Sequence, residues 1–316
     1  MTDRFAIAHV SDVHLAPLPP FWPWHWNVKR ALGYANWLRK RKFEHRRATT
    51  DRMVADLKRQ RADHIVVSGD LTNIGMPREH EWALRWLEAL GSPQDISVIP
   101  GNHDIYCRLW SDRGTQRWAP YAANFAPELG ELMLVDGTFP FVRQLGDCVL
   151  VGVNSAVPTP PVLAVGEVGR EQLERLDRIL EVLSTTRFCR VVVVHHPPMP
   201  GQAKPTRALK DAGKLKQILA RHGAELVLHG HNHRNMLDYC SGPKAQFAVV
   251  GVGSLSMGRR RAAESLAAYN LYFIERADQG FSIEMVQRGL TEPDGDVVEI
   301  GRHVLSPAAP VMDKQS

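Results

Sequence analysis

Acidic, amide and imidazole side chains follow five apolar segments of this 316-residue chain, each at the point where the segment ends. Oxygen and imidazole donors without a thiolate suit Mn²⁺, Fe or Zn²⁺ better than a soft metal. In open α/β sheets, ligands bind at the carboxyl ends of the strands. The five segments end in SDVH, SGD, PGNHD, VVVVHHPP and HGHNH, which contribute Asp12, His14, Asp70, Asn102, His103, Asp104, His195, His196, His231 and His233.

The DVH and HNH sequences each place two of these side chains two positions apart, with one residue between them. In extended chain, alternate side chains leave the same face, so Asp12 and His14 are expected to reach one ion together. A glycine, which lets backbone approach a crowded centre closely, also stands directly before three of the candidates. These glycines are Gly69, Gly101 and Gly230.

Alternating apolar runs and helical patterns must position these side chains. The periodicity predicts buried strands followed by helices, which indicates a sheet covered on both faces. Thr49 or Thr50 is the expected N-cap of the first helix. The expected strands are 4–12, 64–70, 96–104, 148–155, 190–196 and 224–233, and the expected helices are 49–61, 78–90, 170–183 and 209–223. From about residue 234 the runs become β-type and suggest a second sheet packed on the first.

The order DVH, GD, GNHD, HHPP and GHNH resembles that of the calcineurin-like metallophosphoesterase family, over roughly residues 4–256. The resemblance implies an α/β fold, a four-layer α/β/β/α sandwich with two mixed sheets flanked by helices. We expect one domain over residues 1–305. Within it, residues 16–48 form a basic insertion and residues 234–305 a β-rich C-terminal part. Residues 306–316 are expected to be a disordered tail.

By the same resemblance, the chain would hold two divalent metal ions. Asp70 would bridge them, and His196 would not be a ligand. His103 would stabilise the transition state or protonate the leaving oxygen, with Asp104 orienting its ring. The first ion would take Asp12, His14, Asp70 and His233, and the second Asp70, Asn102, His195 and His231.

Two ions about 3.5–4 Å apart share a hydroxide that attacks phosphorus in line. Family members with similar length and motif sequences include bacterial cyclic-nucleotide and glycerophosphodiester phosphodiesterases. By this resemblance, a small phosphodiester is the expected substrate. One alternative is a membrane-surface hydrolase of a lipid-linked phosphoester or pyrophosphate, like UDP-diacylglucosamine hydrolase. Another is a non-catalytic scaffold of the same fold. The chain has no GxxxxGK[ST], GxGxxG or GxSxG motif to support other chemistries.

Residues 16–48 concentrate the positive charge of the chain. They hold eight Lys or Arg residues against Glu44, a net charge of +7, whereas the whole chain carries +5. Val28, Leu32, Ala35 and Leu38 recur at helical spacing. Cations opposite apolar and aromatic side chains are typical of a peripheral membrane binder. Packing of the tryptophans on the body is the equal alternative, and nucleic acid is disfavoured. The segment also holds Trp22, Trp24, Trp26 and Trp37.

The cysteines and the N-terminal sequence bear on the compartment. Cys107, Cys148, Cys189 and Cys240 are scattered and form no CxxC pair, which suits a reducing compartment. The first residues show no signal-peptide pattern. We therefore expect a cytoplasmic protein, with peripheral contact to the inner membrane if residues 16–48 bind lipid, and leave a homo-oligomer open.

Overall fold

The computed structural model describes residues 4–20, 22–108, 113–133, 139–278 and 280–305, and the expected tail at 306–316 lies outside them. One six-stranded sheet has the order β12-β11-β10-β1-β2-β3. Its β1, β2 and β3 run parallel, and β10 pairs antiparallel with β1. The bounds are β1 Phe5–Val10, β2 His64–Val67, β3 Ile96–Val98, β10 Ala268–Arg276, β11 Phe281–Leu290 and β12 Val297–Val304.

The second six-stranded sheet has the order β4-β5-β6-β7-β9-β8. Here β5, β6, β7 and β9 run parallel, and β4 and β8 close the edges antiparallel. Its strands are β4 Phe141–Leu145, β5 Cys148–Val153, β6 Cys189–Val194, β7 Leu226–His229, β8 Met236–Ser241 and β9 Gln246–Gly251.

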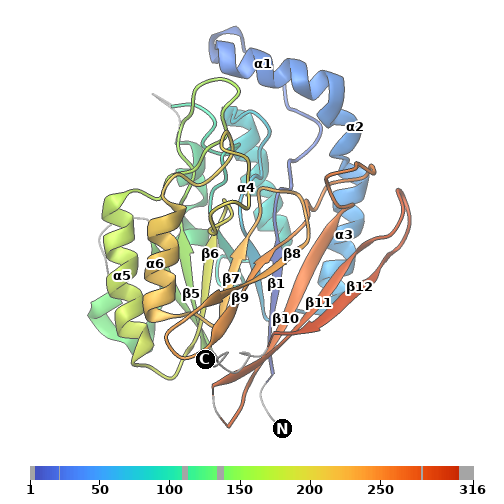
Figure 1. Ribbon diagram of the computed structural model, residues 1–316. Coiled ribbons are helices and arrows are strands. Elements are labelled where there is room, and N and C mark those ends of the chain that lie inside the picture. Colours follow the sequence, from blue (N-terminus) through green and yellow to red (C-terminus); the bar gives the residue numbers. More distant parts are fainter. Residues whose placement is uncertain (1–3, 21, 109–112, 134–138, 279, 306–316) are drawn as a thin grey trace, which may run out of the picture.

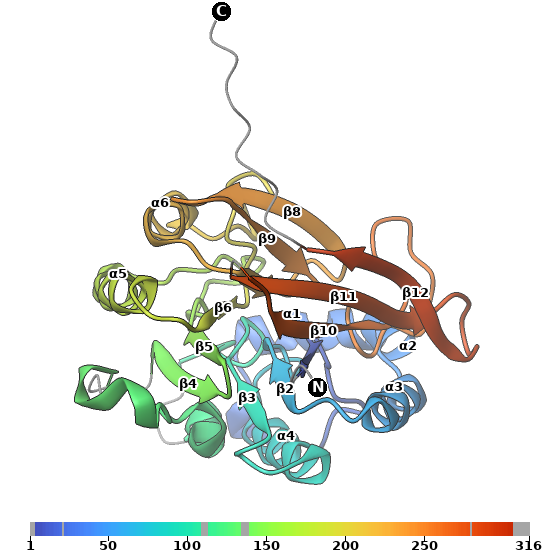
Figure 2. The same cartoon turned by 90° about the horizontal axis from the view of Figure 1, so that it is seen from below.

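The two sheets face each other, and helices cover their outer faces (Figures 1 and 2). Helices α3 (Arg47–Gln60) and α4 (Pro77–Leu90) lie on the first sheet, and α5 (Arg170–Ser184) and α6 (Ala212–His222) on the second. Three apolar cores separate the four layers, one between the sheets and one under each helix pair. The four-layer α/β/β/α sandwich is therefore confirmed.

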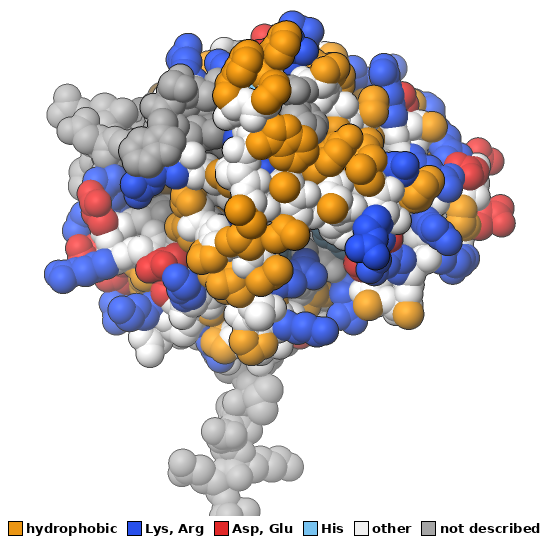
Figure 3. Space-filling view, turned by 90° about the horizontal axis from the view of Figure 1, so that it is seen from above, with side chains coloured by type: hydrophobic (Ala, Val, Ile, Leu, Met, Phe, Trp, Pro, Cys, Tyr) orange, Lys and Arg blue, Asp and Glu red, His pale blue; other side chains and the backbone are white. Residues whose placement is uncertain are grey.

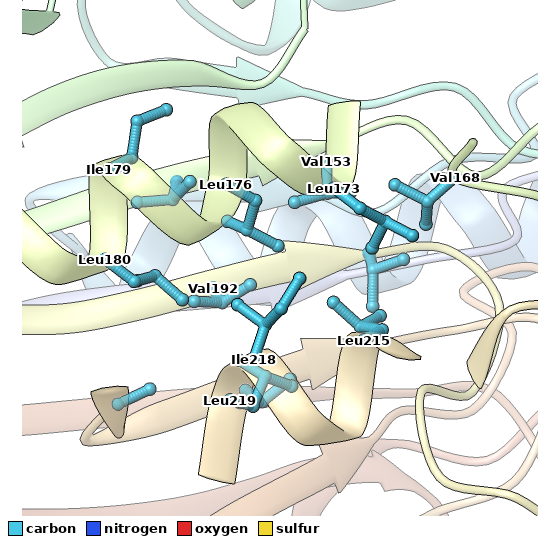
Figure 4. Close-up of a cluster of buried hydrophobic side chains, with 14 of the residues drawn as sticks. Val153, Val168, Leu173, Leu176, Ile179, Leu180, Val192, Leu215, Ile218 and Leu219 are labelled. Atoms are coloured by element: carbon cyan, nitrogen blue, oxygen red, sulfur yellow. The ribbon is translucent and has the colours of Figure 1, made fainter. Parts of the chain in front are cut away.

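Helices α5 and α6 show how the periodicity builds a layer. Leu173, Leu176 and Leu180 recur at three- and four-residue spacing on one face of α5 and are buried. They meet Leu215 and Leu219 of α6 above β6 (Figure 4). Burying each such side chain contributes roughly 1.5–3 kcal/mol, so this face fixes both helices on the sheet.

Two predictions about elements were wrong. The strands after residue 234 do not form a separate sheet, because β8 and β9 extend the second sheet while β10 to β12 extend the first. An apolar β run carries no mark of which sheet edge it joins. The first long helix also begins at Arg47, not after a threonine cap. Thr50 lies inside it and donates its hydroxyl to the carbonyl of Arg46 at 3.3 Å.

The insertion at residues 16–48 crosses the top of the molecule in Figure 1. Asn27 caps its longest helix by accepting from the Arg30 amide at 2.9 Å. None of the described helices has the length and apolar character needed to cross a bilayer. The insertion contains η1 Pro23–His25, α1 Val28–Asn36, η2 Trp37–Arg41 and α2 Lys42–Glu44, and the remaining short helices are η3 Gly114–Ala122 and η4 Pro127–Met133.

Helix α1 is oriented opposite to a typical surface helix, with charged side chains toward the body and apolar side chains toward solvent. Lys29 and Arg30 are buried against the body, whereas Val28 and Leu32 are 70% and 52% exposed. The Lys29 ammonium donates to the Tyr106 carbonyl at 2.7 Å. The helical spacing was therefore predicted correctly, but the apolar face points to solvent.

Candidate metal centre

The structure brings the seven predicted ligands together at the carboxyl ends of the central strands of both sheets. The donor atoms of six of them form two groups of three, and within each group all lie within 4.8 Å of one another. One group is Asp12, His14 and His233, and the other is Asp70, His195 and His231.

The first group is compact and deeply placed. His233 Nε2 lies 3.1 Å from Asp12 Oδ1 and 3.3 Å from His14 Nε2. His14 Nε2 is 3.8 Å from the same carboxylate oxygen. Asp12 and His14 have no exposed surface. These donors surround a common point, as ligands of one ion do.

Asp70 links the first group to the second. Its Oδ2 lies 3.4 Å from His195 Nε2 and 3.9 Å from His14 Nε2. Asn102 Oδ1 lies 3.3 Å from His195 Nε2, so the amide also faces this group. A single carboxylate oxygen between both groups is the arrangement needed to bridge two ions.

Hydrogen bonds to the outer ring nitrogens orient all four imidazoles. In metal sites such bonds fix the tautomer and aim the other nitrogen at the ion. Here they leave Nε2 of His14, His195 and His233, and Nδ1 of His231, directed inward. The partners are the Thr72 carbonyl for His14 (2.9 Å), the Ser68 carbonyl for His195 (2.7 Å), the Arg207 carbonyl for His231 (2.9 Å) and the Glu264 carboxylate for His233 (3.2 Å).

The charges at the centre fit divalent cations. Asp12 Oδ1 is buried and faces the imidazole nitrogens of His14 and His233, which are themselves candidate ligands. Burial opposes the charge of His195, but the Asp70 carboxylate outweighs it and raises the pKa of His195 to about 9. Asp12 in the same way raises the pKa of His233 to about 8 against burial. The buried carboxylates are thus stabilised by positive charge close by. When bound, metal ions would supply that charge in place of the protons on His195 and His233.

The local backbone differs from the extended chain that the DVH and HNH pairs suggested. The ligands on these loops lie in the left-handed region, so the loops turn sharply to bring the side chains inward. The extended-chain argument was therefore wrong, although the side chains do converge. The φ values are 52° at Asp12, 40° at His14, 56° at Asp70, 69° at His231 and 53° at His233.

The glycines that precede the ligands stand where a Cβ atom would collide with neighbouring atoms. A Cβ on Gly101 would lie 2.2 Å from Asp70 Oδ1, and one on Gly230 would lie 1.9 Å from the Ser11 hydroxyl oxygen. Gly69 combines such crowding with a φ of +100°. The expected close approach of backbone to the centre is present at all three positions.

His103 lies beside the ligands with its Nδ1 bonded to the Asn73 carbonyl. Its backbone amide donates to Asp70 Oδ1 at 2.7 Å. Asp104 was expected to orient this ring, but its carboxylate instead accepts three backbone amides, from Asp70, Thr72 and Gly101, at 2.8–2.9 Å. Asp104 therefore holds the ligand-bearing loops together.

His196 offers no free nitrogen to the centre. Its Nδ1 lies 2.8 Å from the Ser155 hydroxyl, and its Nε2 lies 3.2 Å from the Ala164 carbonyl. Of the two neighbouring histidines, His195 is the one whose Nε2 faces Asp70, in agreement with the expectation that His196 is not a ligand.

Sequence reasoning missed three residues beside the centre. The His45 ring lies 4.5 Å from that of His14, Glu264 bonds His233, and Arg41 reaches His103. They come from the insertion and from a distant loop, so no motif spacing connects them with the ligands. They line a cavity of about 230 Å³ that opens onto Asp70, Asn102, His103, His231 and His233.

The family model of the calcineurin-like phosphoesterases matches residues 5–235. The chain belongs to this family, whose motif order, two-sheet fold and paired histidine and carboxylate groups it shares. 

Two curated relatives match in sequence. A probable cyclic nucleotide phosphodiesterase of Synechococcus sp. is 31% identical over 193 residues, which cover 59% of this chain and 65% of the relative. A glycerophosphodiester phosphodiesterase of Enterobacter lignolyticus is 50% identical over 46 residues, or 15% of this chain and 16% of the relative. The chain thus spans less than two thirds of the length of either relative.

Two solved structures share the fold. A dimetal phosphatase from Danio rerio has a TM-score of 0.56 and 14% identity, with 96% of this chain and 99% of that chain covered. A purple acid phosphatase from yellow lupin has a TM-score of 0.55 and 13% identity, with 95% and 54% covered. At this identity, the likeness supports the sandwich architecture alone.

Proposed function

We propose that the protein is a dinuclear metal-dependent phosphodiesterase acting on a small phosphodiester, with a cyclic nucleotide or a glycerophosphodiester as the leading substrate classes. The observation that carries the proposal is the position of Asp70 Oδ2 between the two ligand groups. The two sequence relatives, a probable cyclic nucleotide phosphodiesterase and a glycerophosphodiester phosphodiesterase, support the choice.

When bound, two divalent ions would lower the pKa of a bound water and neutralise charge on the phosphoryl oxygens. The protein itself holds the geometry. Asp70 fixes the separation of the two groups, and Asp104 ties together the loops that carry Asp70 and Asn102 through three backbone amides. His103 stands at the cavity wall, where it can contact an oxygen of the substrate.

Hydrolysis of bis-p-nitrophenyl phosphate with added Mn²⁺, Fe²⁺ or Zn²⁺ tests the proposal. Asp70→Asn should lower the rate at least about 10³-fold and reduce bound metal below that of the wild type, because a neutral amide replaces the charged carboxylate that both groups share. Asp294→Asn is the matched control, since Asp294 is an exposed partner of Arg46 and Arg52. Bound metal without turnover on a panel of phosphodiesters would favour a non-catalytic scaffold.

A second candidate function is hydrolysis of a lipid-linked phosphoester or pyrophosphate at a membrane surface. It is favoured by the apolar outer face of the insertion, which we define as Trp22, Trp24, Trp26, Val28, Leu32 and Leu38. All six side chains are exposed, and the rings of Trp22 and Trp24 stack with centroids 5.3 Å apart. Seen from this side, hydrophobic side chains form a broad area with Lys and Arg beside it (Figure 3).

The occupant that this surface fits best is an anionic bilayer. Lys40 and Lys42 are exposed shortly after the apolar helix, so cations border the aromatic side chains. Each cation near an anionic leaflet contributes about 1 kcal/mol, and buried apolar side chains add to the binding. Since Lys40 and Arg41 also line the metal cavity, a docked membrane would lie at its mouth.

Flotation with vesicles of phosphatidylglycerol and phosphatidylcholine tests this candidate. The wild type should float with mixed vesicles but not with phosphatidylcholine alone, and the double variant Trp22→Ser/Trp24→Ser should lose most binding. Phe125→Ser is the control, because Phe125 is an exposed aromatic residue outside the apolar outer face. If the wild type ignores anionic vesicles, the lipid-linked substrate loses its support, whereas turnover of small diesters is unaffected.

A further inference from the structure

Arg41 ends a π-helical turn that redirects the insertion toward the metal centre. The turn η2 spans Trp37–Arg41, between the α-helical segments α1 and α2. π-Helical turns insert one residue into a helix and occur often at functional sites. Here Arg39 points to solvent, whereas Arg41 lines the cavity with Asp70 and His103.

The Arg41 guanidinium is only partly used by the protein. Its Nη1 donates to His103 Nε2 at 2.8 Å. Its Nε and Nη2 are buried and have no hydrogen-bond partner among the residues that the structure describes. No ion pair joins Arg41 to a carboxylate within that same part of the chain. A buried guanidinium stays charged, and leaving its donors unmatched costs free energy.

The acids near Arg41 already have other partners, so they do not balance its charge. The two carboxylates are the acids nearest the centre, and both are held by the ligand groups. Glu264, another acid on the cavity wall, is engaged by His233 and Arg261. Glu44, also on the wall, has its Oε1 3.6 Å from Arg261 Nε. The free donors of Arg41 therefore lack an anion, and the cavity beside them is where one would bind.

We infer that Arg41 is a substrate-binding residue whose guanidinium binds two oxygens of the phosphoryl group through its free Nε–H and Nη2–H donors. A planar guanidinium matches two oxygens of a phosphate in this way, which an ammonium cannot do. The inference rests on the proposed function and adds a protein contact to the phosphoryl group beside the metals. The contact to His103 uses Nη1, so the phosphoryl group would bind at the two other donors, next to His103 Nε2.

The test compares Arg41→Gln and Arg41→Lys with Arg39→Gln, which removes the same charge from the solvent side of the same turn. Each metal-loaded variant is assayed for kcat and KM on bis-p-nitrophenyl phosphate, and inorganic phosphate binding is measured by calorimetry. We expect Arg41→Gln to lower kcat/KM by about 10²–10³-fold, as loss of a charged donor at a transition state does. It should also weaken phosphate binding at least about tenfold, while metal content stays at the wild-type value.

Arg41→Lys should recover only part of the loss, because a lysine offers no planar fork. Arg39→Gln should stay within about twofold of the wild type in both measurements, because this side chain faces solvent. Equal phosphate affinity and equal kcat/KM in Arg41→Gln and Arg39→Gln would overturn the inference while leaving the phosphodiesterase intact. A wild type that binds phosphate but hydrolyses no diester would instead overturn the proposed function.

Discussion

At the scale of single residues, identical side chains at the centre differ in what their second nitrogen contacts. His195 and His196 are neighbours, yet only His195 keeps one nitrogen directed at Asp70. The HHPP sequence showed that a histidine ends the strand, and the choice between the two came from the family pattern. The convergence of these side chains was thus predictable from motif order, whereas the bonds that select a tautomer depend on carbonyls from distant loops.

His103 illustrates a residue whose presence, but not its surroundings, was predictable. It follows Asn102 in GNHD, yet its ring is held by Asn73 and by Arg41, which lies 62 positions away. Burial, reinforced by the Arg41 charge, lowers the pKa of His103 to about 3. The ring is therefore neutral, and its Nε2 accepts the N–H bond from Arg41.

His103→Ala should keep both metal ions and lose most of the rate. The metals should stay because the bond from residue 103 to Asp70 comes from the backbone amide. The rate on bis-p-nitrophenyl phosphate should fall by about 10²–10⁴-fold, the usual contribution of a positioned imidazole. Metal analysis and kcat, with the exposed His303→Ala as control, decide the point. Loss of one ion per chain would show that His103 is a ligand.

At the scale of elements, the strands that end at the centre were predicted well, because each couples an apolar run to polar residues. The C-terminal strands were assigned to the wrong sheet. β10 pairs with β1, more than 250 positions earlier in the chain, and no local pattern encodes that pairing. The orientation of α1 was equally hidden, since an apolar stripe has the same spacing whether it faces a core or solvent.

The turn at Gly101 is the element on which the second ligand group depends most. A Cβ there would lie 2.2 Å from Asp70 Oδ1 and 2.6 Å from the Asp70 amide nitrogen. Gly101→Ala should displace the shared carboxylate and weaken metal binding by about 10–100-fold, as changes around metal ligands do. Metal titration of the apoprotein measures the effect.

Gly213→Ala provides the matched control for that substitution. Gly213 lies in α6, and an added Cβ would meet nothing within 4 Å. It should leave metal affinity unchanged and stabilise the protein by roughly 0.5–1 kcal/mol through helix propensity. Equal metal affinity in both variants would show that the close approach at Gly101 has no part in holding Asp70.

At the scale of the whole molecule, the two sheets form one scaffold with the ligands at its upper edge and buried polar groups within it. His64 lies on β2, away from the metal ligands, and its Nε2 is 2.9 Å from the Ser97 hydroxyl. Burial, with a contribution from Arg143, lowers the pKa of His64 from 6.5 to about 3. The folded protein therefore keeps this ring neutral where the unfolded chain would protonate it.

The sign of the pH dependence follows from that difference. Between pH 6.5 and about 3 the unfolded chain binds a proton that the native state does not, so stability from His64 is complete above pH 6.5 and is lost as the pH falls. From about pH 7.5 to about pH 5.5, His64 should account for a loss of ~1.4 kcal/mol in the free energy of unfolding. In His64→Gln, whose amide can keep the bond to Ser97, the free energy of unfolding measured in urea should fall by that much less over this pH range than in the wild type. The variant His303→Gln, at an exposed position, should show the same fall as the wild type. Parallel curves for His64→Gln and the wild type would mean that the ring is protonated in the native state, and that the inner region of the first sheet admits charge.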